Sequence, residues 1–145
     1  MFKDSKVFSG FSVDDLAKAR RFYGDTLGLD VKQDDMGLTL HLGTGADVFI
    51  YPKGDQHEPA SFTILNFPVN DIDRAVEALK AKGVKFEHIE MQVPMGEKGE
   101  MITIKTEPSG IIHSDAPEHG PHIAWFKDPA GNTLAVLQEI KAKTG

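Results

Sequence analysis

Phe11-Ser-Val13-Asp-Asp15-Leu16-Ala-Lys-Ala19 decides the fold of this chain, because it returns 56 residues later as Phe67-Pro-Val69-Asn-Asp71-Ile72-Asp-Arg-Ala75. Four positions are identical and a fifth exchanges Leu for Ile. Self-similarity at one offset indicates a duplicated structural unit. Half of a 145-residue chain is too small to bury an adequate core alone, so the two copies are predicted to share one core.

Each copy of the repeated phrase joins a strand to a helix. Residues 6–13 alternate as a strand does, and the helix predicted at 15–28 follows a cap at Asp14. The second copy repeats this order, with a strand at 62–69 and a helix at 72–83 capped by Asn70. Further strands are predicted at 29–33, 38–42, 47–51, 84–91, 122–127 and 133–138.

This order predicts an α+β fold of two βαβββ modules in a single domain over residues 1–145. Module one covers about 6–52 and module two about 60–138. The segment from about 93 to 120 has no counterpart in module one and is predicted to be an inserted loop, in which 101–105 can add a strand. Loops of this length often serve as functional lids.

The composition excludes several classes of function. Sixteen basic and twenty-two acidic residues give a net charge of −6, which lacks the positive footprint of a nucleic-acid-binding protein. The first residues contain no apolar signal region and no apolar run reaches membrane-spanning length, so we expect a soluble cytoplasmic protein without a membrane partner. Without cysteine, any metal site must use His and carboxylates.

Two motifs point to a known family. The run from Val13 to Leu29, with Ala19-Arg-Arg-Phe-Tyr23 and Leu27-Gly-Leu29, together with Asp128-Pro-Ala-Gly-Asn132, resembles the vicinal oxygen chelate superfamily. This group includes glyoxalase I, extradiol dioxygenases, and bleomycin and fosfomycin resistance proteins. The resemblance implies paired βαβββ modules whose sheets curl around a cleft, often in a homodimer, with metal ligands on the first and last strand of each module.

The positions at which the family usually has metal ligands hold apolar side chains in this chain. Counting seven residues back from the Asp that opens each helix gives Phe8 and Ile64, where the family usually has His. The last-strand position, usually Glu, corresponds to Ala135 in module two and to Phe49 in module one. A divalent ion among these side chains would be desolvated without partners, so we predict no metal and no cofactor.

Strand alternation predicts which residues face the cleft. Phe11, Val13, Phe67 and Val69 belong to the helix-facing set, so the alternate residues line the opposite face. That face is predicted to be aromatic and mostly uncharged, a suitable pocket for a small hydrophobic or aromatic molecule. The predicted ligand-binding residues are Phe8, His41, Asp47, Phe49, Tyr51, Ile64, Asn66, Trp125 and Ala135.

Three functions stay open at the level of the sequence. The first is a metal-free binding protein that sequesters an aromatic or amphipathic ligand. The second is a glyoxalase-, lyase-, isomerase- or dioxygenase-like enzyme, using metal-free acid–base groups or displaced ligands such as His41, His113, His119 and His122, with Asp115 and Glu118 nearby. The third is a regulatory module whose cleft is filled by its own side chains. His57 and His88 are predicted to have surface roles, and no Ser-His-Asp pattern is evident.

Overall fold

A computed structural model describes residues 1–95 and 97–141, which form two compact units. Unit one contains Met1–Ile64 together with Asp128–Asn132, a short segment from the second half of the sequence. Unit two contains Leu65–Lys127 and the residues from Thr133 on. The turn Asp128–Asn132 of the family motif therefore packs with module one, although module two supplies it.

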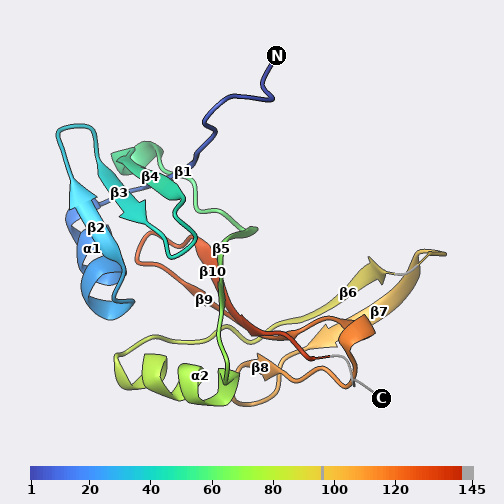
Figure 1. The fold of residues 1–145 in the computed structure, drawn as a ribbon. Coiled ribbons are helices and arrows are strands. Elements are labelled where there is room, and N and C mark those ends of the chain that lie inside the picture. The colour runs from blue at the N-terminus through green and yellow to red at the C-terminus, as the bar shows by residue number, and fades with distance from the viewer. Residues whose placement is uncertain (96, 142–145) are drawn as a thin grey trace. The chain divides into compact units, whose positions relative to one another are not determined.

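Unit one is built on a four-stranded sheet with the order β1 (Ser9–Val13), β4 (Asp47–Pro52), β3 (Leu38–His41), β2 (Asp30–Gln33). The β1 and β4 strands are parallel, and the other neighbours are antiparallel (Figure 1). A short 3-10 turn, η2 (Gly54–Gln56), follows β4. These strands confirm the predicted βαβββ order of the first module, with β1 beginning three residues later than expected.

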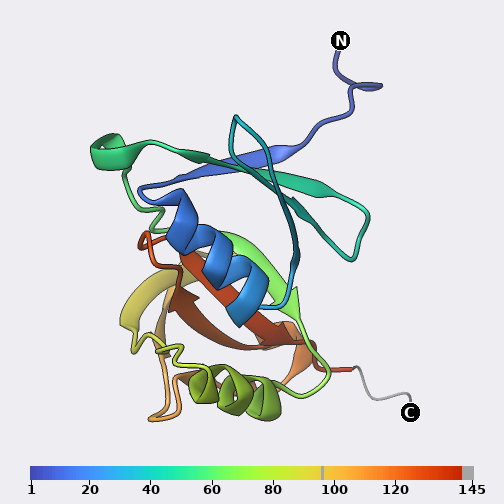
Figure 2. The same ribbon diagram turned by 90° about the vertical axis from the view of Figure 1, so that its left-hand side faces the viewer.

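The strand β1 leads directly into helix α1 (Leu16–Arg21), which continues as a π-helical turn, η1 (Phe22–Thr26) (Figure 2). The Asp15 carboxylate accepts a hydrogen bond from the Lys18 backbone N–H at 3.1 Å. Asp15 therefore caps the helix, and the predicted cap at Asp14 is wrong by one residue. The π turn buries Tyr23 completely, 5.8 Å from the ring of Phe11.

Unit two repeats the strand order of unit one. Its sheet runs β5 (Thr63–Pro68), β10 (Thr133–Gln138), β9 (His122–Lys127), β8 (Ile111–Ile112). Helix α2 (Ile72–Ala81) contacts β10 and β9 and buries Ile72 and Val76. Asp71, rather than the predicted Asn70, caps this helix by accepting from the Arg74 backbone N–H at 3.1 Å.

The segment between α2 and β9 differs from the sequence prediction. A strand is predicted at 84–91, but residues 84–89 form only an isolated β-bridge, between Phe86 and Phe126. The chain then forms a hairpin of β6 (Glu90–Met95) and β7 (Glu100–Lys105), the strand β8, and a short 3-10 turn, η3 (Pro117–His119). The segment predicted as an inserted loop at 93–120 thus contains the end of β6, all of β7 and all of β8, and the added strand predicted at 101–105 is confirmed (Figure 1).

The burial pattern follows strand alternation in unit one. Leu38 and Leu40 of β3, with Val48 and Ile50 of β4, are buried, and the residues between them are partly or fully exposed. In unit two, by contrast, β10 buries three consecutive residues, Leu134–Val136. Among the described residues, no helix is long and apolar enough to cross a membrane.

Candidate functional site

The exposed face of the unit-one sheet carries four of the nine predicted ligand-binding residues: His41, Asp47, Phe49 and Tyr51. His41 and Thr39 of β3 and Asp47, Phe49 and Tyr51 of β4 alternate with the buried core residues of the same strands. The ladder places Thr39 opposite Phe49 and His41 opposite Asp47. The predicted strand parity is therefore correct for these two strands, and it brings aromatic and polar side chains onto one surface.

A cavity of about 680 Å³ lies on this face, and we call it the sheet cavity. Phe8, Asp47 and Phe49, three of the predicted residues, line it. The remaining lining residues come from the N-terminal segment, from β3 and from the turns at either end of β3: Lys6, Val7, Asp34, Met36, Thr39, Gly45 and Ala46. Phe8 lies before β1 and is 67% exposed, so it contributes from the rim.

The aromatic surface of β4 continues beyond the sheet cavity. The rings of Phe49 and Tyr51 stack, with centroids 6.0 Å apart and planes inclined by 21°. Tyr51 is 39% exposed and faces a second cavity, described below. Two stacked rings on neighbouring same-face positions offer a flat apolar surface of the kind on which a ligand ring can stack.

His41 and Asp47 form a hydrogen-bonded pair on the same face. His41 Nδ1 lies 2.5 Å from the Asp47 carboxylate, so this nitrogen carries the hydrogen. The other ring nitrogen, Nε2, is buried and has no hydrogen-bond partner within the described residues. With Nδ1–H held by the carboxylate, neutral His41 presents Nε2 as a bare acceptor, which is the atom that a general base uses.

A second cavity, of about 430 Å³, lies between β1 and the segment that leads into β5, and we call it the loop cavity. The predicted residues Tyr51 and Ile64 line it, together with Ser12 and Asn132. The rest of its lining comes from β1 and from the segment that leads into β5: Ser9, Gly10, Phe11, Glu58, Pro59, Ala60, Ser61, Phe62 and Thr63.

The turn Asp128–Asn132 organises the wall of the loop cavity. Asp128 is 4% exposed, and its carboxylate accepts hydrogen bonds from the Tyr23 hydroxyl at 2.7 Å and from the Asn132 side chain at 3.0 Å. It also accepts from the backbone N–H groups of Ala130 and Asn132. Burial raises the pKa of Tyr23 and the adjacent Asp128 carboxylate raises it further, so the hydroxyl stays protonated and donates.

Asn132 and His57 connect this turn to the strand and loop beside it. The Asn132 amide donates to the backbone oxygen of Ser12 at 2.9 Å and accepts from the Ala60 N–H at 2.9 Å. His57 contacts the Ser12 hydroxyl at 2.8 Å through Nδ1 and the Ala130 carbonyl at 2.9 Å through Nε2. The predicted surface role of His57 is therefore wrong, because both of its ring nitrogens have partners distant in the sequence.

Three predicted site residues belong to unit two. Asn66 of β5 is exposed, Trp125 of β9 is half-buried, and Ala135 of β10 is fully buried. Trp125 lies opposite Ala135 in the β9–β10 ladder, so the two residues share one face of this sheet. Their role in ligand binding stays a prediction.

The histidines of the inserted segment bond to separate partners. His113 contacts Glu107 at 2.7 Å and Asp73 of α2 at 3.1 Å, and His119 contacts Asp115 at 2.7 Å. His122 Nδ1 accepts from the Ser114 backbone N–H at 2.9 Å. Across residues 1–95 and 97–141, no three His, Asp or Glu side chains are grouped so that they could hold a metal ion. His88 is exposed, as expected.

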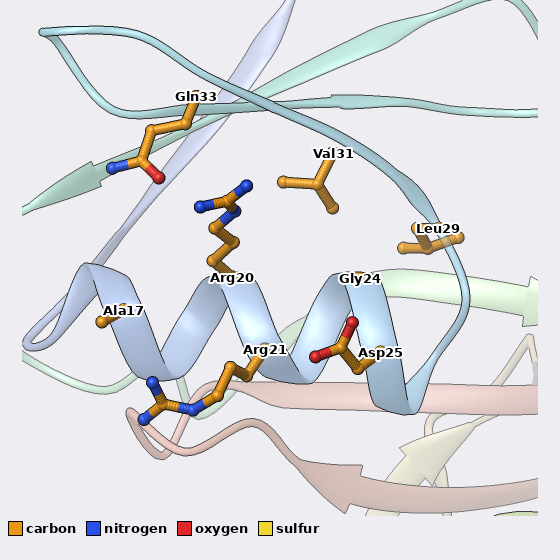
Figure 3. A pocket seen from close by; sticks show the side chains of 8 residues that line it. All are labelled: Ala17, Arg20, Arg21, Gly24, Asp25, Leu29, Val31 and Gln33. Atoms are coloured by element: carbon orange, nitrogen blue, oxygen red, sulfur yellow. The ribbon is translucent and has the colours of Figure 1, made fainter.

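A third cavity, of about 490 Å³, lies between α1, η1 and β2 (Figure 3). Arg20 reaches toward Val31 and Gln33 of β2, whereas Arg21 points away from them. The residues that line this cavity belong to the helical side of the sheet and include none of the predicted ligand-binding residues. Predicted ligand-binding residues instead line the sheet cavity and the loop cavity, which together form the candidate site.

Comparison with known families decides the identity of the fold. Residues 8–136 match the model of the Glyoxalase/Bleomycin resistance protein/Dioxygenase superfamily. The chain belongs to this superfamily. The match covers both modules and the inserted segment, so the predicted resemblance is confirmed. A search of curated proteins found no match.

Solved structures of the superfamily share the fold at low sequence identity. A genomically encoded fosfomycin resistance protein from Listeria monocytogenes matches with 14% identity and a TM-score of 0.62, over 92% of both chains. An antibiotic binding protein from Streptomyces sp. CB03234 matches with 22% identity and a TM-score of 0.56, over 92% of this chain and 96% of that one.

A Sphaerobacter thermophilus member of the Glyoxalase/bleomycin resistance protein/dioxygenase superfamily matches with 22% identity and a TM-score of 0.58. The match covers 92% of this chain and 97% of that one. At these identities the likeness shows the fold, and the activity must be argued from the residues of the site. The α+β class predicted from the duplicated phrase is thereby confirmed.

Proposed function

We propose that this superfamily member binds a small aromatic or amphipathic molecule on the exposed face of β3 and β4, without the metal ion that the family's enzymes use. The observation that carries the proposal is the sheet cavity, of about 680 Å³, which Phe49 and Asp47 line beside the stacked ring of Tyr51. Ligand sites in proteins have volumes of roughly 300–1,000 Å³ and combine apolar walls with a few polar groups.

The chemistry of this face favours a ring with a polar substituent. Phe49 and Tyr51 supply the apolar surface, where stacking adds roughly 0.5–1.5 kcal/mol to the burial of the ring. Asp47, His41 and Thr39 stand on the same side of the sheet and can accept or donate hydrogen bonds to a substituent. These groups fix the orientation of the ligand while the rings supply most of the affinity.

The residues at the family's metal positions do not fit a metal ion. Phe8, Phe49, Ile64 and Ala135 provide no N or O side-chain donor, and Ala135 is fully buried. A divalent ion requires several converging donors, and its charge would be desolvated and unpaired beside these side chains. The proposed ligand binding on this face therefore involves no metal ion.

The relatives support a small organic ligand as the class. One similar structure is that of an antibiotic binding protein and another is that of a fosfomycin resistance protein. The first name states that the protein binds an antibiotic and the second that the protein confers fosfomycin resistance, and both proteins share the fold of this chain. Sequestration of a small molecule is therefore a function that this fold supports in the superfamily.

Metal-free acid–base catalysis is the second candidate, and one observation favours it. His41 Nε2 is buried without a partner while Asp47 holds Nδ1, the arrangement that makes a neutral imidazole a base. His41 does not line the sheet cavity itself, so a suitable substrate class is a carbonyl compound with an acidic C–H that binds on the face of β3 and reaches this nitrogen. Turnover of such a compound that is lost in His41→Gln would establish this function over sequestration.

A thermal-shift screen against small aromatic compounds tests the binding proposal. A ligand that binds only the folded state raises the free energy of unfolding by mass action, by about 2.7 kcal/mol at a hundred times its Kd, and the melting temperature rises with it. We expect the shift to vanish in Phe49→Asp, because a carboxylate would replace the ring at the cavity wall.

Met101→Asp provides the matched control for the screen. Met101 lies on β7 of unit two, is 60% exposed, and receives the same added charge away from the sheet cavity. Its response to the ligand should equal that of the wild type. A flat response of the wild type to the whole library, or an equal shift in Phe49→Asp, would reject the proposal.

A further inference from the structure

The contact between Ser12 and His57 has a defined direction. His57 Nε2 lies 2.9 Å from the carbonyl oxygen of Ala130, which can only accept, so Nε2 carries the hydrogen. A neutral imidazole then has a bare Nδ1, and the Ser12 hydroxyl, 2.8 Å away, donates its hydrogen to it. The serine oxygen is thus hydrogen-bonded to a base, the relation that activates serine nucleophiles.

Ser12 is held in place from both its backbone and its side chain. Asn132, which is 1% exposed, donates to the Ser12 backbone oxygen at 2.9 Å, and His57 binds the hydroxyl. Both anchors depend on the turn Asp128–Asn132, since Ala130 in that turn fixes the imidazole. A nucleophile and base held by a rigid turn are positioned before a substrate arrives.

Ser12 also borders a cavity that could hold a substrate. It lines the loop cavity of about 430 Å³, with Tyr51, Phe62 and Ile64 as apolar neighbours in the lining. This volume is within the range of small-molecule sites, and its apolar lining suits a small aryl ester. The serine, its base and a substrate-sized space therefore coincide.

We propose that Ser12 is a nucleophile toward small activated acyl esters, with His57 Nδ1 as its general base. This activity goes beyond ligand binding in the sheet cavity, because its nucleophile and base line or adjoin a different cavity, although Tyr51 borders both sites. The sequence gives no sign of it, since Ser12 and His57 are 45 positions apart and follow no nucleophile motif.

The reaction of p-nitrophenyl acetate illustrates the steps. Ser12 Oγ attacks the acyl carbon while its proton passes to His57 Nδ1, and the bond to p-nitrophenolate breaks to leave acetyl-Ser12. His57 releases this proton to the leaving phenolate or to water. A water molecule then attacks the acetyl group, giving its proton to His57, and Ser12 Oγ leaves as acetate forms and recovers the proton. One ester and one water thus give acetic acid and p-nitrophenol, and the acetic acid ionises in neutral solution to acetate and a proton.

The test combines burst kinetics with peptide mapping of the full chain. Incubation with p-nitrophenyl acetate should release a burst of p-nitrophenolate and add one acetyl group at Ser12, which mass spectrometry of the wild type locates without any variant. Ser12→Ala should abolish the burst, and Ser12→Cys should restore acylation through the thiol. His57→Gln, which removes the base, should slow acylation on the order of 100-fold.

Ser5→Ala and His88→Gln are the matched controls, because both residues are exposed and lie outside the loop cavity. Both should acylate at the wild-type rate, and circular dichroism should show that each variant is folded. Acetyl groups found only on lysines or the N-terminus of the wild type, with Ser12 unmodified, would overturn the proposal. An undiminished burst in folded Ser12→Ala would overturn it equally.

Discussion

At the scale of single residues, Asp128 joins the turn Asp128–Asn132 to Tyr23 of η1 within unit one. Its carboxylate is buried and accepts hydrogen bonds from Tyr23, from its own turn and from the Asn132 side chain. A buried carboxylate is costly to desolvate unless its oxygens are satisfied, and here they are. The turn that identifies the family is thereby a structural joint, and it positions the side chains around the loop cavity.

Asp128→Ala should lower the free energy of unfolding by about 3 kcal/mol, because it leaves a buried hydroxyl and an amide without an acceptor. Tyr23→Phe, which removes one donor and leaves the others, should cost roughly 1–2 kcal/mol. Urea unfolding measures both. Asp34→Ala is the control, since Asp34 is an exposed turn carboxylate that accepts from backbone N–H groups. Equal losses in Asp128→Ala and Asp34→Ala would contradict this role.

At the scale of elements, His113 ties helix α2 to the segment between β7 and β8. Its ring bridges Asp73 and Glu107. Hydrogen bonding with Glu107 raises the pKa of His113 above its ordinary value of 6.5, and hydrogen bonding with His113 lowers the pKa of Glu107 below its ordinary 4.5. The stabilisation from protonated His113 is complete below pH 6.5 and lost as pH rises through the raised pKa.

The stability difference between the wild type and His113→Gln should therefore depend on pH. The contribution of ionised Glu107 is present above pH 4.5 and lost as pH falls through its lowered pKa, so the difference should be greatest between pH 4.5 and 6.5. It should shrink at alkaline pH as the imidazole loses its proton. Chemical denaturation at a series of pH values measures it, and a pH-independent difference would contradict the tie.

Gly37, in the turn between β2 and β3, has no room for a side chain. A Cβ there would lie 2.2 Å from the Ile50 carbonyl oxygen, and its φ is +156°. Gly37→Ala should cost at least about 1–3 kcal/mol of unfolding free energy. Gly43→Ala, at the other end of β3, meets open space and should be nearly neutral. Thermal unfolding compares the two, and similar melting temperatures would contradict the expectation.

Local patterns predict the elements that the modules share, and long-range pairing decides the rest. The helices and the strands of the repeated phrase have clear alternation or helical spacing, so their place follows from Phe11, Val13 and their counterparts. The outer strand of unit two is only Ile111–Ile112, too short to recognise in sequence, and it pairs with β9 after the β6–β7 hairpin. Pairing of this kind is a tertiary choice that propensity does not encode.

The candidate site likewise contains residues that strand alternation predicts and residues that only long-range contacts bring together. Phe49, Asp47 and Tyr51 were accessible to prediction because strand parity assigns a face to each residue. His57 was not, because its partners Ser12 and Ala130 lie 45 and 73 positions away. The turn Asp128–Asn132 packs within unit one, and this packing brings Ala130 to the ring of His57.

At the scale of the whole molecule, the superfamily fold is retained while the side chains at its metal positions are apolar. Purified protein should therefore contain less than stoichiometric zinc, iron, nickel or manganese by elemental analysis, since Phe8, Phe49, Ile64 and Ala135 offer no side-chain donor. One equivalent of metal that survives dialysis and is lost in His41→Gln would contradict the metal-free proposal and favour displaced ligands.

A crystal structure of the protein with the aromatic compound that gives the largest thermal shift tests the central claim most directly. We predict electron density for its ring against Phe49 and Tyr51, with a polar substituent within hydrogen-bonding distance of Asp47, His41 or Thr39. Density for the compound only in the cavity between α1, η1 and β2, or a coordinated metal ion on the face of β3 and β4, would contradict metal-free binding on this face.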